Sequence, residues 1–176
     1  EGVGAGGGGC GGRGSAVKHV GGWRGGAVTE ASRQDWEGIF SSNLMTALYV
    51  CRAVLPQMRK GRWGRIINLG AVGAERAFGQ AKISAYAAAK AAVVALSRSL
   101  ALEEATNGIT VNVVNPSSID ENELTLSEAR SMRDARFPIG RPPTVEDVAA
   151  TVAFFASEEA EYVTGQVMNV SGVWMS

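Results

Sequence analysis

Cysteine, histidine and net charge are all scarce in this sequence. Cys10 and Cys51 have no metal or redox spacing, and His19 is the only histidine, so we expect no metal site. The 17 basic residues balance 17 acidic residues, which gives no electrostatic footprint for nucleic acid. We identify no apolar run that spans a bilayer and no secretory signal at the N-terminus. These absences predict a cytoplasmic protein that binds neither nucleic acid nor membrane.

Residues 1–26 also lack any helix or strand period, and they hold 13 of the 23 glycines. Glycine loses the most backbone entropy on ordering, so we predict a flexible leader over 1–26 and one domain over 27–176. Gly4, Gly6 and Gly9 match G-x-G-x-x-G. No predicted strand precedes this match, so we attribute the match to the high glycine content of the stretch rather than to a phosphate-binding turn.

The remaining sequence alternates strand and helix patterns, which favours an α/β fold with a parallel sheet. Candidate helix N-caps are Thr29 or Ser32, Ser84, and Thr144. We predict strands at about 65–70, 109–114 and 166–170, and helices at about 33–59, 84–106 and 144–157.

Tyr86 and Lys90 lie four residues apart in the second predicted helix, so both side chains project from one face. A neighbouring ammonium favours a phenolate and lowers the pKa of the phenol. Such a pair can exchange a proton with a carbonyl or alcohol oxygen. The spacing is also compatible with a half-exposed tyrosine beside a solvated lysine.

The context of this pair resembles the short-chain dehydrogenase/reductase family over about residues 29–175. The strand at 66–69 precedes the pair, and the next strand ends in Asn115-Pro116. The family's W-x6-N-L pattern is matched by Trp36, Asn43 and Leu44. The resemblance, closest to the 3-oxoacyl reductases, implies an incomplete Rossmann-like fold, NAD(P)(H) as the cofactor and a small carbonyl or alcohol substrate.

The resemblance also implies site roles. Tyr86 is the acid–base group, Lys90 lowers its pKa and holds the nicotinamide ribose, and Asn43 anchors a water. Backbone near Pro116 and Ile119 contacts the nicotinamide.

Several positions depart from the family pattern. The serine that holds the substrate oxygen is replaced by Ala71, and the loop from there to Tyr86 is about two residues longer than usual. Ser84 is a possible substitute for the missing hydroxyl. Pro-Gly after the second strand is Pro116-Ser117 here, and a serine restricts φ more than glycine does.

The family's glycine-rich turn, T-G-x-x-x-G-x-G, and its N-N-A-G strand end are not recognised in the sequence. A fragment, a frameshifted reading frame and a truncated paralogue are all compatible with this pattern.

Two functions therefore stay open at this stage. One is hydride transfer between nicotinamide and a carbonyl or alcohol carbon. The other is a catalytically silent half-domain that acts through association. We expect a homo-oligomer through the two longest helices, whose apolar faces carry Cys51, Ala88 and Val93.

Overall fold

The computed structural model describes residues 14–18, 21–119 and 124–174. The G-x-G-x-x-G match, Cys10 and His19 lie outside these ranges. All structural statements below concern the described residues.

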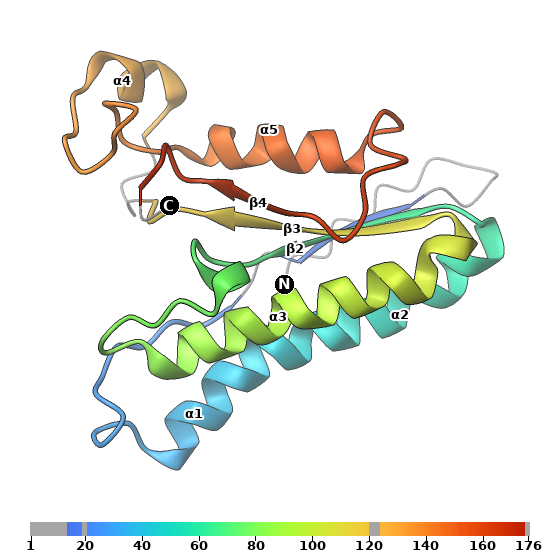
Figure 1. Ribbon diagram of the computed structural model, residues 1–176, viewed down its shortest axis with the longest axis horizontal. Coiled ribbons are helices and arrows are strands. Elements are labelled where there is room, and N and C mark those ends of the chain that lie inside the picture. The colour runs from blue at the N-terminus through green and yellow to red at the C-terminus, as the bar shows by residue number, and fades with distance from the viewer. Residues whose placement is uncertain (1–13, 19–20, 120–123, 175–176) are drawn as a thin grey trace.

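A four-stranded parallel sheet forms the centre of the fold (Figure 1). Its strands lie in the order β1 (Ser15–Lys18), β2 (Gly64–Leu69), β3 (Ile109–Pro116) and β4 (Val167–Val170). The last three are the predicted strands. The expected α/β, Rossmann-like class is therefore confirmed.

Strand β1 corrects the expectation of an unstructured stretch from residue 1 to residue 26. Ser15 pairs with Arg65, and Lys18 pairs with Asn68. Ala16 is buried in the core. Four residues are too few to show an alternating pattern among glycines, and this strand is ordered by pairing with the fully buried β2. The fold therefore begins before the predicted boundary at residue 26.

The first predicted helix consists of three consecutive segments. They are α1 (Arg33–Phe40), the π-helix η1 (Ser41–Met45) and α2 (Thr46–Gly61). Ser32 caps α1 through a capping box with Asp35. Helix α2 continues past Pro56 to Gly61, and its C-cap Arg62 adopts the left-handed conformation at φ 49°. The π-helix has no signal in the sequence pattern.

Helix α3 (Ser84–Glu104) carries the Tyr86–Lys90 pair and continues into the 3₁₀ turn η3 (Ala105–Asn107). Ser84 is not its N-cap. Ile83 occupies that position, since its carbonyl accepts the first helical hydrogen bond from the Ala87 amide, and its apolar side chain cannot provide a cap.

The remaining described elements are short. They are the 3₁₀ turn η2 (Ala74–Arg76), α4 (Leu126–Ser131) and α5 (Val145–Ala156). Thr144 caps α5 through a capping box with Asp147, as predicted.

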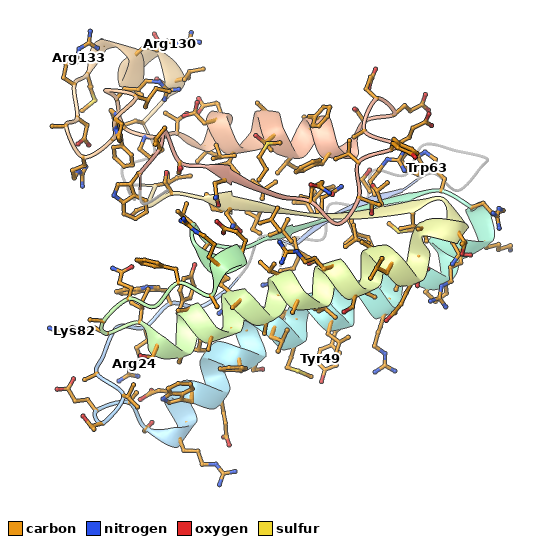
Figure 2. The ribbon with its side chains drawn as sticks, in the orientation of Figure 1. Arg24, Tyr49, Trp63, Lys82, Arg130 and Arg133 are labelled. Carbon is orange, nitrogen blue, oxygen red and sulfur yellow. The ribbon has the colours of Figure 1, made fainter. Side chains whose placement is uncertain are left out.

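The helices form layers on both faces of the sheet (Figure 1). Helices α1, α2 and α3 cover one face, and α5 covers the other. Cys51 and Val93 are each 1% exposed and belong to the core, so they cannot form the association surface expected of them. Ala88 is exposed, and Figure 2 shows Tyr49 on the side of α2 that faces away from the sheet.

Two helical stretches, Arg33–Gly61 and Ser84–Asn107, are long and apolar enough to cross a membrane by length and composition alone. This corrects the expectation that no such run exists. Both stretches pack beside the sheet and bury polar side chains, among them Asn43, Lys90 and Glu104. Core helices of water-soluble proteins pass the same test, so it is weak evidence for a membrane span.

Candidate active site

The carboxyl ends of β2 and β3 and the first turns of α3 surround a pocket of about 380 Å³. Ala71 enters from the end of β2, Pro116 from the end of β3, and Tyr86 from α3. Parallel strands place their carboxyl ends along one edge of the sheet, where ligand sites form in such folds. Three of the predicted site residues therefore line one pocket.

Lys90 does not line this pocket; it lines an adjoining cavity of about 30 Å³, which also includes Ala71 and Tyr86, and is 4% exposed. Its Nζ donates a 2.9 Å hydrogen bond to the Leu69 carbonyl at the end of β2. The same nitrogen lies 5.5 Å from the centroid of the Tyr86 ring. The one-turn spacing thus brings the pair together, and the alternative of a solvated lysine is wrong.

The electrostatics of the pair differ from the expectation. Burial raises the pKa of Tyr86, whereas the sequence argument predicts a lowered value. The ammonium lies over the ring, and its hydrogen bond goes to the Leu69 carbonyl. Burial, and secondly the charge of Lys18, lower the pKa of Lys90 to about 8. A lysine in this range can gain or lose a proton near neutral pH.

Lys18 is a part of this region that the sequence argument missed. It ends β1, is 6% exposed and donates from Nζ to the Ser42 carbonyl over 3.2 Å. Burial lowers its pKa. The sequence contained a signal for Lys18. In the family's N-N-A-G strand end, the glycine comes three residues after the first asparagine, and Gly21 comes three residues after Lys18. The glycine is the one residue of that motif that this sequence retains.

Asn43 is fully buried in the π-helix η1. Its Nδ2 donates to the Ile39 carbonyl at 3.0 Å and to the Gly22 carbonyl at 2.9 Å. A Cβ on Gly21 would lie only 2.1 Å from Asn43 Oδ1, so that position requires glycine. Asn43 does not line the Tyr86 pocket. Instead, it fastens the segment that follows β1 to η1.

Ile119 and Ser117, which follow β3, lie in different environments. The Ile119 side chain packs with the core cluster beneath α5. Ser117 lines the Tyr86 pocket, and its backbone does not adopt a positive φ, so serine is accommodated without strain.

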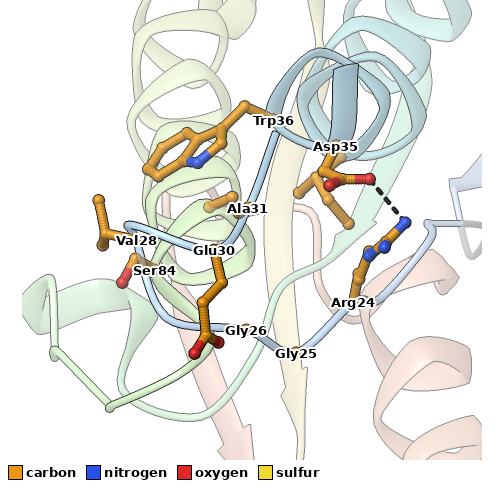
Figure 3. Close-up of a pocket in the computed structure, with 11 residues that line it drawn as sticks. Arg24, Gly25, Gly26, Val28, Glu30, Ala31, Asp35, Trp36 and Ser84 are labelled. Atoms are coloured by element: carbon orange, nitrogen blue, oxygen red, sulfur yellow. Dashed lines mark ion pairs between the residues drawn. The ribbon is translucent and has the colours of Figure 1, made fainter. Parts of the chain in front are cut away.

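Ser84 lies in a different cavity of about 160 Å³ between α1 and α3 (Figure 3). Arg24 and Asp35 form a 2.6 Å ion pair there. The structure therefore does not place Ser84 where it can replace the hydroxyl that Ala71 lacks.

The loop between Ala71 and Tyr86 is held by Glu75, which the sequence argument also missed. Its carboxylate accepts hydrogen bonds of 2.9 Å from Asn115 Nδ2 and from Asn169 Nδ2. Burial raises the pKa of Glu75, but the bonds from Asn169 and its other donors outweigh it and leave a net lowering. A charged Glu75 thus fixes the loop to the ends of β3 and β4.

Similar proteins agree with this architecture. A family model described as enoyl-(acyl carrier protein) reductase matches residues 12–172. The chain belongs to the short-chain dehydrogenase/reductase family. It is 42% identical over 143 residues to the 3-oxoacyl-[acyl-carrier-protein] reductase FabG of Escherichia coli, covering 79% of this chain and 57% of that protein.

Two further relatives show the same relation. The FabG reductase of Pseudomonas aeruginosa is 38% identical over 159 residues, which cover 89% of this chain and 63% of that protein. The crystal structure of acetoin dehydrogenase YohF from Salmonella typhimurium superposes with a TM-score of 0.83 at 32% identity, over 92% of this chain and 64% of that one. The chain therefore spans less than two thirds of the length of these relatives. In its described residues, no cluster of three or more histidine, cysteine or acidic side chains offers a metal site.

Proposed function

We propose that this chain is an NAD(P)-dependent oxidoreductase that acts on a small carbonyl or alcohol substrate, with Tyr86 as the acid–base group. The observation that carries the proposal is the convergence of Tyr86, Ala71 and Pro116 on one pocket, with the Lys90 ammonium directly behind the phenol ring. Membership of the family supports it.

The residues fit the nicotinamide end of the cofactor. The pocket of about 380 Å³ has the size of a small-molecule site. Lys90 donates one hydrogen bond to the Leu69 carbonyl, so its remaining N–H groups are available to ribose hydroxyls. Pro116, and Ile119 beyond it, offer backbone to the carboxamide. The bound cofactor supplies or accepts the hydride.

The side chains of this chain handle the proton. Tyr86, kept protonated by burial, is suited to donate to a ketone oxygen. The Lys90 ammonium stabilises the phenolate that this leaves. Asn43 holds the neighbouring segment in place through Gly22 and is proposed to anchor the water that connects Lys90 to solvent.

The same reasoning predicts a weak enzyme. Ala71 offers no hydrogen-bond donor to the substrate oxygen, and loss of one such donor costs on the order of 10²–10³ in rate. The sequence contains no T-G-x-x-x-G-x-G turn for the pyrophosphate. We therefore expect weak NAD(P)H binding and slow turnover by the chain as given.

Ketone reduction with NADPH, followed together with a fluorescence titration of NADPH, tests the proposal. Tyr86→Phe should reduce turnover by at least about 10²-fold, because the transferred proton is removed. Tyr162→Phe is the matched control, since Tyr162 is 98% exposed. Equal turnover by the two variants would refute the role of Tyr86.

A second candidate is a catalytically silent protein that acts through association, and Ala71 favours it. In either case we propose a homo-oligomer in the cytoplasm. Its contacts would use the outer faces of α2 and α3, where Tyr49 is 57% exposed and Leu102 is 82% exposed. Light scattering at micromolar concentration tests this, and a monodisperse monomer would refute it.

A further inference from the structure

The pocket around Tyr86 has Ala71 where the family has a serine. The other side-chain donors of the pocket are therefore the candidates to bind the substrate oxygen. Trp23, Gln80 and Ser118 line the pocket but are exposed, and Trp174 is half-buried. Ser117 also lines the pocket and is 7% exposed. It is the buried hydroxyl of this pocket.

The Ser117 hydroxyl has no hydrogen-bond partner among the described residues. Burying a hydroxyl without a partner is unfavourable, and native proteins seldom retain one. Its backbone is fixed, because the Ser117 amide donates a 3.1 Å hydrogen bond to the Val170 carbonyl of β4. A serine χ1 has three staggered positions, so the hydroxyl can turn toward a ligand while the backbone stays in place.

We propose that Ser117 Oγ donates the hydrogen bond to the substrate carbonyl oxygen that Ala71 cannot donate. This proposal rests on the proposed function, because it assigns a ligand to the same pocket. The hydroxyl is shielded in the ligand-free protein and gains its partner when a ketone enters beside Tyr86. The serine that replaces the family's glycine is therefore a binding residue and not a neutral exchange.

Four versions of the 176-residue chain test the proposal: the unaltered protein, Ser117→Ala, Ala71→Ser and the double variant. The probe is ethyl acetoacetate labelled with ¹³C at the ketone carbon, without cofactor. Quenching of Trp23 and Trp174, which line the pocket, gives the dissociation constant. The ¹³C shift of the bound ketone reports a hydrogen bond to its oxygen.

Ser117→Ala should weaken probe binding by roughly fivefold and move the bound ketone shift upfield. Ala71→Ser should tighten binding by supplying a second donor. In that background the effect of Ser117→Ala should shrink to less than about twofold, because one oxygen is then already satisfied. The melting temperature of Ser117→Ala should be unchanged or raised, since the hydroxyl has no partner in the protein.

An unchanged dissociation constant and ketone shift in Ser117→Ala would overturn the proposal, as would equal losses in both backgrounds. Failure of all four chains to bind the probe would overturn it as well. A melting temperature lowered by several degrees would show a structural role instead. None of these readouts requires turnover. Absence of NADPH oxidation together with the expected binding changes would refute the proposed function and leave the role of Ser117 intact.

Discussion

The two ends of the parallel sheet differ in how their buried charged groups are partnered. At the amino ends of the strands, Glu104 is fully buried, and its carboxylate forms a two-pronged ion pair with Arg59. Asn107 adds a third donor at 3.0 Å. Arg65, 2% exposed, donates to the carbonyls of Ser157 and Gly64. The buried charges there have partners, although the buried Thr110 hydroxyl near the start of β3 has none among the described residues.

At the carboxyl ends, buried groups are incompletely satisfied. Lys18 and Lys90 donate to backbone carbonyls, and no carboxylate in the described parts of the chain bonds to either ammonium. Oδ1 of Asn43, Oδ1 of Asn115 and Oγ of Ser117 have no described partner. Buried groups left without partners have a free-energy cost unless a ligand satisfies them. The comparison separates an end that stabilises the fold from an end suited to a ligand.

The largest expected effect comes from breaking the satisfied end. Arg59→Ala removes the ion-pair partner of the buried Glu104 carboxylate, and we expect it to lower the free energy of unfolding several times more than the loss of a surface arginine does. The loss is moderated because the Arg59 side chain is 53% exposed and water partly screens the pair. Urea denaturation gives the value.

Arg52→Ala, on the exposed face of the same helix, is the control and should change stability by less than about 0.5 kcal/mol. Equal losses in both variants would show that the Arg59–Glu104 pair contributes nothing beyond a surface arginine.

The next effect concerns the unsatisfied end and depends on pH. The pKa of Lys90 is about 8 in the folded protein, against 10.5 for an ordinary lysine. Between these values the unfolded chain binds more protons than the folded one, so stability rises with pH. From pH 8 to about pH 10 this gain should approach roughly 2 kcal/mol. From about pH 9 the pKa of Cys51, which burial raises to about 11, acts in the opposite direction, and at higher pH the raised pKa of Tyr86 does the same.

Lys90→Met should remove the part of the rise that comes from Lys90 and keep the part that comes from Lys18, whose pKa burial also lowers, whereas Lys60→Met, on the exposed end of α2, should retain both. Denaturation midpoints measured at several pH values provide the test. The same pH dependence in Lys90→Met and in the unaltered protein would mean that Lys90 does not cause the rise.

The sequence could predict the features that local signals determine. The apolar runs of β2 and β3 and the capping residues Ser32 and Thr144 are local signals, and they located those elements correctly. The Tyr86–Lys90 proximity followed from helical spacing alone. These features depend on neighbours within a few residues, so a single sequence contains the information.

The missed features depend on contacts distant in the sequence. Strand β1 is defined by its pairing with β2 rather than by its own four residues. Glu75 acquires its role only when the ends of β3 and β4 bring Asn115 and Asn169 to it. The predicted direction of the Tyr86 pKa shift was wrong. The spacing shows that a charged lysine lies one helical turn away, but it does not show how deeply the phenol is buried.

The smallest expected effect tests whether the unsatisfied end acts as a unit. Lys18 lies on β1 and Lys90 on α3, and the charge of Lys18 is the second cause, after burial, of the lowered Lys90 pKa. Lys18→Met keeps the length of the side chain but removes the charge. We therefore expect the pKa of Lys90 to rise while staying below its ordinary value, because burial remains. NMR titration of the Lys90 side chain measures the shift, and the pH window of rising stability should move upward with it. An unchanged Lys90 titration would show that the two lysines are electrostatically independent, and the carboxyl end would then be two separate buried charges rather than one site.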